Sequence, residues 1–207
     1  MAMKTWWLYV TAVFLIAATP GPNMLHVMVQ SIQQGARRTT ASMAGLMTAN
    51  LTCLIASAAG LGALLKASPM LFEVLRYVGV GYLVWLGIKA WRAPVSSGDG
   101  AIEPHARRSI RALYLTGLGT GLSNPKLILF ATALLPQFID TGRPFGTQLA
   151  ILTGSFMVIE LFWFSVYALG GRSLSHWLAP ANRKLLFNRV SGTLFFGFGA
   201  ALLGSKV

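Results

Sequence analysis

Long apolar blocks, with the charged residues confined to short segments between them, run through the whole of this chain. Hydrophobic residues fill 55% of the 207 positions and charged residues 11%, whereas roughly 25% of an ordinary soluble domain is charged. A helix that crosses a bilayer needs about 20 apolar residues in succession. The sequence therefore predicts an all-α protein embedded in a lipid bilayer and argues against a soluble globule.

Six segments are long and apolar enough to cross a bilayer as helices. The third is the least regular, because its uncharged part is too short to span alone and its flanking charges must reach the membrane surface. The fourth and fifth each carry one charge near the middle, Lys126 and Glu160. The expected limits of the six are 6–29, 41–65, 70–91, 112–139, 144–171 and 185–205.

Basic residues concentrate in the joints after the first, third and fifth segments. The positive-inside rule places such joints in the cytoplasm, so both termini are expected in the periplasm, on the outer side of a bacterial inner membrane. The residues that decide this are Arg37, Arg38, Lys89, Arg92, Arg107, Arg108, Arg111, Arg172, Arg183, Lys184 and Arg189.

A polar stretch at 94–110 has no periodic apolar face and is expected to be a cytoplasmic linker. It divides a single membrane domain, 1–207, into two halves of three helices each, 1–93 and 111–207. Because three is odd, the second half enters the membrane in the opposite sense, as in the inverted 3+3 repeats of secondary transporters.

Proline interrupts two of the expected helices near their middle. Thr19-Pro20-Gly21-Pro22-Asn23 breaks the first, because proline removes a backbone donor and clashes with the preceding turn. Asn124-Pro125-Lys126 interrupts the fourth at a similar depth. Two simple kinks are one interpretation, but paired interruptions in corresponding halves are typical of a transporter's site at mid-membrane. Exposed helix ends would suit both charges of a zwitterion, so we expect substrate contacts from Pro20, Gly21, Pro22, Asn23, Asn124, Pro125 and Lys126.

Lys126 and Glu160 are the charged residues nearest the centre of the bilayer. A charge there costs roughly 2.5–3.5 kcal/mol on insertion scales if it has no partner, so both should face the protein interior. One interpretation is a buried ion pair that fixes packing. The other makes Glu160 a proton-exchanging or ammonium-binding group and Lys126 its counter-charge or a carboxylate ligand. Trp163 and Tyr167, on the same face as Glu160, either wall a cavity or simply pack.

Three further polar residues lie at membrane depth. Asn23 either caps the helix that resumes after the break or contacts substrate. Asn50 either hydrogen-bonds between helices or lines the site, and His26, one turn beyond the break, is a candidate proton relay. Small residues also form a stripe that permits a homodimer but equally explains packing within one subunit. Its members are Gly45, Ala49, Thr52, Ala56 and Gly60.

Several classes of function are excluded. The formal net charge is +12, but the basic residues form no stripe along a helix, which argues against nucleic-acid binding. The chain has no ATP-binding G-x-x-x-x-G-K-[ST] loop, no H-E-x-x-H metal helix and no G-x-S-x-G nucleophile elbow. The single cysteine, Cys53, allows neither a disulfide nor a C-x-x-C site. We expect no metal, no cofactor and no enzymatic activity, which leaves a secondary transporter or a channel.

Four motifs make the chain similar to the LysE/RhtB family of bacterial amino-acid and homoserine exporters. They are the break at 19–23, the joint at 35–45, the segment RYVGVGYLVWLG at 76–87, and Asn124-Pro125-Lys126. The resemblance spans nearly the whole chain and implies six membrane helices, export from the cytoplasm and coupling to the proton gradient. An acidic residue before an aromatic also recurs in that family, at the position of Glu160. The resemblance does not fix the substrate.

The paired breaks and the two mid-membrane charges predict transport of a small solute, and the resemblance implies export of an amino acid or related metabolite, of the homoserine, threonine or lysine type, in antiport with protons. Glu160 and Lys126 would exchange partners as substrate and proton bind, with His26 as a candidate relay. The alternatives are a non-transporting membrane scaffold or complex subunit, and a transporter of a different small solute or of a cation.

Overall fold

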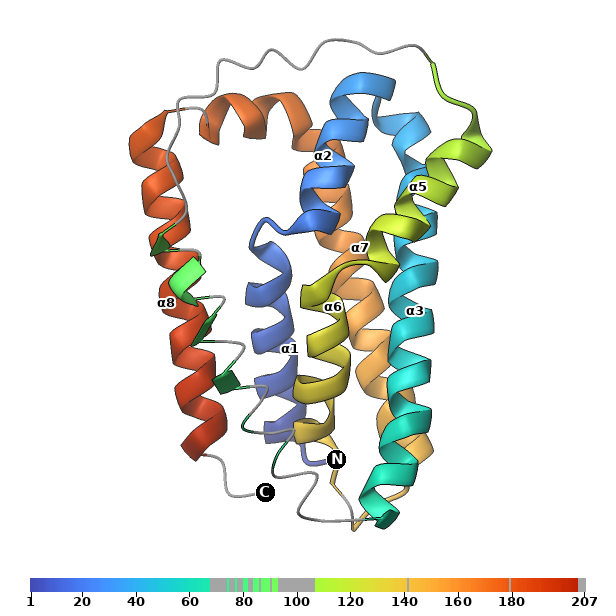
Figure 1. Ribbon diagram of the computed structural model, residues 1–207, viewed down its shortest axis with the longest axis vertical. Coiled ribbons are helices and arrows are strands. Elements are labelled where there is room, and N and C mark those ends of the chain that lie inside the picture. The colour runs from blue at the N-terminus through green and yellow to red at the C-terminus, as the bar shows by residue number, and fades with distance from the viewer. Residues whose placement is uncertain are drawn as a thin grey trace.

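The computed structural model describes residues 1–67, 107–140, 142–178 and 180–204, together with separate residues between 74 and 92. Within these ranges the chain is helical and contains no strand, which confirms the all-α prediction (Figure 1). Helix η1 is a π-helix and η2 a 3-10 helix. The elements are α1 (Met3–Ala18), α2 (Pro22–Gln34), α3 (Ala36–Ala67), α5 (Ile110–Leu122), α6 (Pro125–Leu129), η1 (Phe130–Leu134), η2 (Leu135–Phe138), α7 (Phe145–Leu178) and α8 (Ala181–Gly204).

The helices agree in length and composition with a membrane protein. In the described part, Ala36–Gly60 of α3 and Phe145–Gly171 of α7 are each long and apolar enough to cross a bilayer. Two bent helix pairs, α1 with α2 and α5 with α6 to η2, raise the number of spans to four if each pair counts as one. The predicted third span, 70–91, and the linker, 94–110, lie mostly outside the described residues. Six spans therefore stay a prediction.

Both predicted interruptions are confirmed. α1 ends before Thr19 and α2 starts at Pro22, with a bend of 50° between them, and the bend between α5 and α6 is also 50°. The physical reason is the one expected from the sequence, since Pro22 and Pro125 each occupy the first position of the helix that follows.

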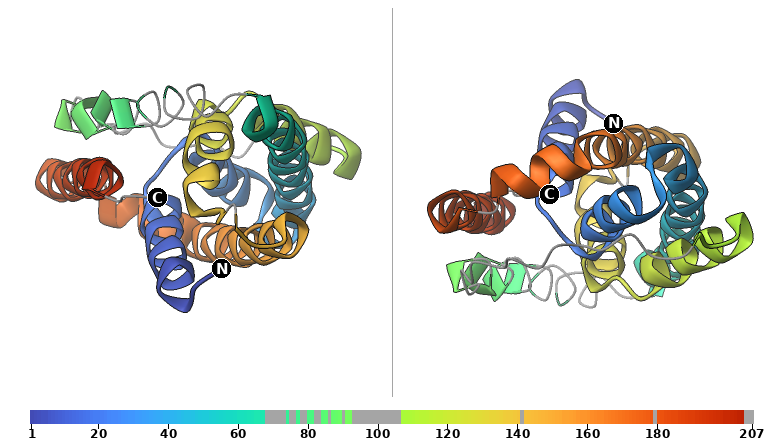
Figure 2. Two further views of the ribbon diagram at one scale, coloured as in Figure 1. Left: turned by 90° about the horizontal axis from the view of Figure 1, so that it is seen from below. Right: turned by 90° about the horizontal axis from the view of Figure 1, so that it is seen from above.

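α3 packs mainly against α5, and α7 packs against α1, α2 and α3. In Figure 1, α1 and α6 lie in the middle of the molecule with α7 and α3 beside them, while α8 stands apart on one edge. The buried face of α1 includes Tyr9, Val13 and Ile16. The views along the long axis show α1 at the edge of the group formed by α2, α3, α5, α6 and α7 (Figure 2).

The small-residue stripe of α3 divides into two parts. Gly45 and Ala49 are buried against α5, whereas Thr52, Ala56 and Gly60 are exposed. A Cβ at Gly45 would meet the backbone of Tyr114 and Leu118, so close packing is confirmed for the first half of the stripe only.

The two ends of the molecule differ in charge. The start of α1 and the end of α8 lie at one end, and the joint between α2 and α3 lies at the other, close to the start of α5 (Figure 1). At the second end, Arg38 donates a hydrogen bond to the carbonyl of Arg108, whose N–H donates to Gln34 at 3.0 Å. The first basic joint and the described end of the linker thus meet at this end of the fold, where α7 is also followed by α8 (Figure 1).

Candidate functional site

The two broken helices meet at the side chain of Lys126. Its ammonium donates hydrogen bonds to the carbonyl of Ile16, to the carbonyl of Thr19 at 3.2 Å and to Thr19 Oγ1 at 2.9 Å. These oxygens lie at the end of α1, where the prolines stop the helix. The Ile16 carbonyl also accepts from the N–H and the hydroxyl of Thr19, the C-cap of α1. Lys126 therefore caps the negative end of α1 from the fourth predicted helix.

Asn124 caps the start of α6. Its Oδ1 accepts a hydrogen bond from the backbone N–H of Lys126 at 3.0 Å, and Pro125 follows as the first helical residue. The corresponding role expected of Asn23 is not observed, because Gly21 is the N-cap of α2 and Asn23 already lies inside the helix. Asn23 instead donates a long hydrogen bond, 3.5 Å, to Asn50 Oδ1.

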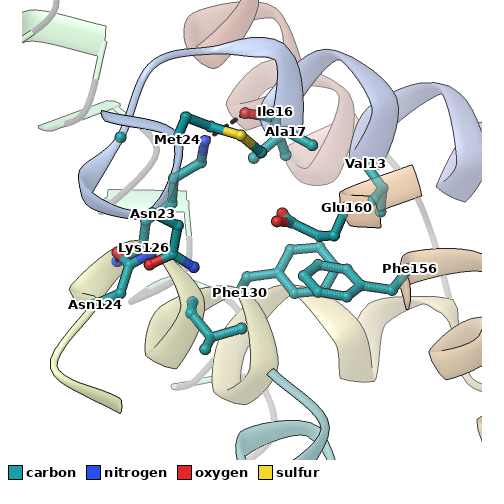
Figure 3. Close-up of a pocket in the computed structure, with 12 residues that line it drawn as sticks. Val13, Ile16, Ala17, Asn23, Met24, Asn124, Lys126, Phe130, Phe156 and Glu160 are labelled. Carbon is teal, nitrogen blue, oxygen red and sulfur yellow. Dashed lines mark hydrogen bonds between the residues drawn. The ribbon is translucent and has the colours of Figure 1, made fainter. Parts of the chain in front are cut away.

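A cavity lies where α1, α2, α6, η1 and α7 come together (Figure 3). Its volume is about 20 Å³, which leaves room for about one water molecule. In this conformation an amino acid does not fit without some widening. The lining residues are Val13, Ile16, Ala17, Gly21, Asn23, Met24, Asn124, Lys126, Leu127, Phe130, Phe156 and Glu160.

Glu160 projects its carboxylate from α7 into this cavity (Figure 3). The residue is 7% exposed, and its Oε2 has no hydrogen-bond partner among the described residues. The ammonium of Lys126 is taken up by the oxygens of α1, and within the described ranges it forms no ion pair with Glu160. A buried carboxylate oxygen without a donor is costly, which makes it a natural partner for a cation or a proton that enters the cavity.

Two asparagine side chains add unpaired polar atoms close to the same place. Asn23 Oδ1 and Asn50 Nδ2 are buried and lack hydrogen-bond partners in the described part of the chain. Asn23 lines the cavity, whereas Asn50, 0% exposed, is not part of the lining and accepts the Asn23 bond. A buried polar atom without a partner costs about 1–3 kcal/mol, so a ligand that bonds to these atoms would recover that free energy.

The predicted site residues are not all brought to the cavity. Gly21, Asn23, Asn124, Lys126 and Glu160 line it. Pro20, Pro22 and Pro125 shape the breaks without lining the cavity. Pro22 and Pro125 are exposed, and Pro20 lies between the two half-helices.

His26 does not line the cavity. Its Nε2 is 2.6 Å from Ser42 Oγ of α3, and its Nδ1 is 3.3 Å from Thr120 Oγ1 of α5. The histidine thus ties three helices together, and its expected role as a proton relay stays a prediction.

Sequence reasoning missed the aromatic wall of the cavity. Phe156 precedes Glu160 by one turn and Phe130 follows Lys126 by one turn, so the helical i, i+4 spacing could have found both. Their rings stack with centroids 4.7 Å apart. Trp163 and Tyr167, the aromatics suggested by the sequence, do not line the cavity: Trp163 packs on Phe14, and the Tyr167 hydroxyl donates to a carbonyl of α1.

Comparison with known proteins identifies the family. A family profile described as LysE type translocator matches residues 14–206. The chain belongs to this family. The match contains the break at 19–23, the Asn124-Pro125-Lys126 motif and Glu160, and it confirms the resemblance seen in the sequence. As a LysE type translocator, the protein is a membrane transporter and not an enzyme.

Named relatives cover the chain almost end to end. The homoserine/homoserine lactone efflux protein of Salmonella typhi is 32% identical over 209 residues, covering 100% of this chain and 99% of the relative. The leucine efflux protein of Enterobacter sp. (strain 638) is 34% identical over 203 residues, covering 95% and 93%. An uncharacterized membrane protein of Vibrio cholerae is 27% identical over 208 residues, with 100% of both chains covered. No solved structure matches this chain.

Proposed function

We propose that this LysE type translocator exports amino acids with uncharged side chains from the cytoplasm across the bacterial inner membrane, in exchange for protons. The observation that carries the proposal is the placement of Glu160 and Lys126. One carboxylate with a free oxygen and one ammonium line a single cavity at the junction of two broken helices. Relatives whose names give efflux of homoserine and of leucine support the same class of substrate.

The two charges of the site correspond to the two charges of an amino acid. The substrate ammonium would bind Glu160, and its carboxylate would bind Lys126 and the positive amino end of α2, where Asn23 and Met24 line the cavity. Glu160 and Lys126 are the only charged residues in the described lining. A lysine-like or glutamate-like side chain would therefore enter without a counter-charge, which is costly at this depth.

In this mechanism the Glu160 carboxylate also takes up and releases the exchanged proton. Glu160 releases the substrate ammonium when it takes a proton from the outer side, and it binds the next substrate when it loses that proton to the cytoplasm. Lys126 would alternate between the substrate carboxylate and the carbonyls of Ile16 and Thr19. The exchange requires that substrate binds with different affinity when Glu160 is protonated and when it is deprotonated.

The proposed architecture is a single membrane domain of two inverted repeats, 1–93 and 111–207, with six spans. The matching 50° bends and their contact through Lys126 support it, because transporters of this design bind substrate between discontinuous helices of the two repeats. Periplasmic termini and a cytoplasmic linker at 94–110 follow from the basic joints. The exposed half of the α3 stripe leaves room for a homodimer.

Purified protein in liposomes tests the function. Vesicles loaded with labelled leucine, homoserine, lysine or glutamate should release the first two at least tenfold faster than the last two when the outside is made acidic. Glu160→Gln should abolish the response to the proton gradient. Arg37→Gln, which removes an exposed charge at the joint between α2 and α3, should leave it intact.

The contrary results are equally specific. Vesicles that retain every solute would indicate a scaffold or complex subunit. Release of lysine as fast as leucine would contradict the charge argument, and a Glu160→Gln variant that still responds to the gradient would remove Glu160 from proton coupling.

A further inference from the structure

A second and larger cavity lies at the end of the molecule where the chain begins. Its volume is about 510 Å³, within the range of cavities that hold small organic ligands. Residues from the start of α1 and the start of α7 form it, among them Trp6, Thr147 and Ile151. By the positive-inside argument this end faces the periplasm, so we name it the outer cavity.

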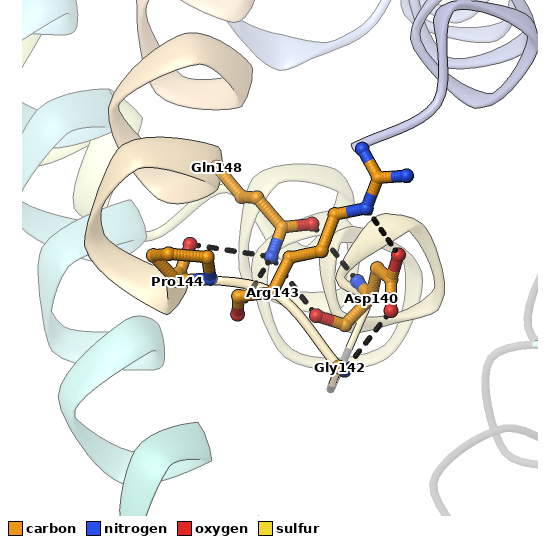
Figure 4. A network of polar contacts seen from close by, with 5 residues as sticks. All are labelled: Asp140, Gly142, Arg143, Pro144 and Gln148. Atoms are coloured by element: carbon orange, nitrogen blue, oxygen red, sulfur yellow. Dashed lines mark hydrogen bonds and ion pairs between the residues drawn. The ribbon is translucent and has the colours of Figure 1, made fainter.

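The rim of the outer cavity is held by a polar network (Figure 4). Gln148 accepts a hydrogen bond from the Asp140 N–H at 3.0 Å and donates to the Asp140 carbonyl at 2.9 Å. Arg143, which also lines the cavity, pairs with the Asp140 carboxylate at 3.1 Å. These bonds fix the entry into α7, so the cavity has a defined shape at this end.

The two cavities lie at successive levels of α1. On α1, Trp6 lines the outer cavity and Val13 lines the central one, with Tyr9 between them. On α7, Ile151 lines the outer cavity and Phe156 the central one. A solute that moved from one cavity to the other along α1 would therefore meet Tyr9 between them.

Tyr9 closes this path with an aromatic layer. It is 0% exposed, and its ring centroid lies 5.0 Å from that of Phe138 and 6.2 Å from that of Phe130. The Phe130 ring in turn stacks on Phe156, which completes the layer across to α7. The Tyr9 hydroxyl donates a hydrogen bond of 2.9 Å to the carbonyl of Leu152, and this bond fixes the ring across the gap between α1 and α7.

The segment that supplies two of these rings is irregular. Phe130 starts the π-helix η1 and Phe138 ends the 3-10 helix η2, so the helix type changes twice within nine residues. Such interruptions weaken the regular hydrogen-bond ladder and are frequent at functional sites. Phe130 and Phe138 thus belong to a segment that can rearrange more readily than a continuous α-helix.

We propose that the outer cavity is the exit vestibule for the transported amino acid and that Tyr9 is the gate residue between it and the central cavity. This inference rests on the proposed export function. The difference in volume agrees with these roles, since about 510 Å³ accommodates a neutral amino acid and about 20 Å³ does not. The structure then represents a conformation closed toward the outside.

Cysteine accessibility tests the gate independently of transport. Cys53 is the only cysteine, so Cys53→Ser gives a clean background in which Ala17→Cys reports on the central cavity and Thr147→Cys on the outer one. A membrane-impermeant cationic thiosulfonate, added from the periplasmic side, should label Thr147→Cys readily and Ala17→Cys slowly. Adding Tyr9→Ala should speed the labelling of Ala17→Cys at least tenfold and leave Thr147→Cys unchanged.

Matched variants separate the gate from a general loosening of the fold. Tyr9→Phe keeps the ring and loses the bond to Leu152, so it should give an intermediate rate. Trp7→Ala truncates an aromatic of the same helix that is 57% exposed, and it should leave the rate as it is. The gate would be overturned if Tyr9→Ala did not speed labelling of Ala17→Cys while Thr147→Cys still reacted normally. It would also be overturned if Ala17→Cys reacted fast with Tyr9 present, or if Trp7→Ala had the same effect as Tyr9→Ala.

The outcome separates this inference from the function on which it rests. A protein that labels as expected but releases no amino acid from liposomes would contradict the proposed function and leave the gated path standing. A protein that transports while Tyr9 has no influence on labelling would contradict the gate alone.

Discussion

Lys126 stabilises the broken end of α1 with the same ammonium that the proposed transport cycle uses. Its inward orientation could be predicted from the sequence, because a lone lysine in an apolar segment must face the protein interior. Its partners could not, since they are backbone carbonyls of Ile16 and Thr19, more than 100 residues away in the chain. Which carbonyls a break exposes depends on the bend direction, and residue type does not encode that direction locally.

The N-cap Asn124 should matter for transport as well as for stability, unlike the N-cap of α5, which should matter for stability alone. Asn124→Ala removes the acceptor for the Lys126 N–H, and losing an N-cap costs about 1 kcal/mol of stability. Because the cap also positions Lys126, amino-acid release should fall at least fivefold. Ser109→Ala, which removes the exposed cap of α5, should cost similar stability without slowing release. Thermal unfolding in detergent and the liposome assay measure the two effects; equal loss of release in both variants would count against the assignment.

Phe156 sets the size of the substrate side chain if the proposed site is right. Phe156→Leu removes part of the aromatic wall and leaves both charges in place, so the rate for phenylalanine relative to leucine should rise at least threefold. Phe162→Leu makes the same change at a 50% exposed position of the same helix, and its ratio should match the unchanged protein. A ratio that moves in neither variant would place the side chain elsewhere.

The contact between α3 and α5 shows how far a sequence pattern can predict the packing of a helix. Small residues at helical spacing predicted a close neighbour for α3, and Gly45 and Ala49 have one. Thr52, Ala56 and Gly60 continue the same pattern but are exposed, because α5 ends at Leu122 and the chain bends away there by 50°. Periodicity identifies a face of a helix, but the length of the partner decides how far that face is covered.

Alanine substitution at two glycines of α5 should change the stability of the protein in opposite directions. A Cβ at Gly117 would collide with the Ser42 backbone of α3, whereas a Cβ at Gly119 meets nothing within 4 Å. Overpacking costs about 1–3 kcal/mol, so Gly117→Ala should lower the unfolding temperature. Gly119→Ala should raise stability by about 0.5–1 kcal/mol through its better helix propensity. The same sign in both variants would show that α3 and α5 do not pack as described.

At the scale of the whole molecule, the distribution of arginines determines the direction of every proposed step. The joints that carry them meet at one end of the fold, while the outer cavity and the chain start lie at the other. The fold alone does not assign these ends to the two sides of a membrane, since the proposed inverted repeat would be nearly symmetric about its midplane. The charge bias supplies that assignment.

Cysteine labelling in cells with an intact inner membrane checks the orientation. In the Cys53→Ser background, Lys4→Cys, exposed at the start of α1, should react with an impermeant reagent added from outside. Arg37→Cys, exposed at the joint between α2 and α3, should react only after the inner membrane is permeabilised. The reverse pattern would place the arginine-rich end in the periplasm. The outer cavity would then open to the cytoplasm, and Tyr9 would control the entry of substrate instead of its release.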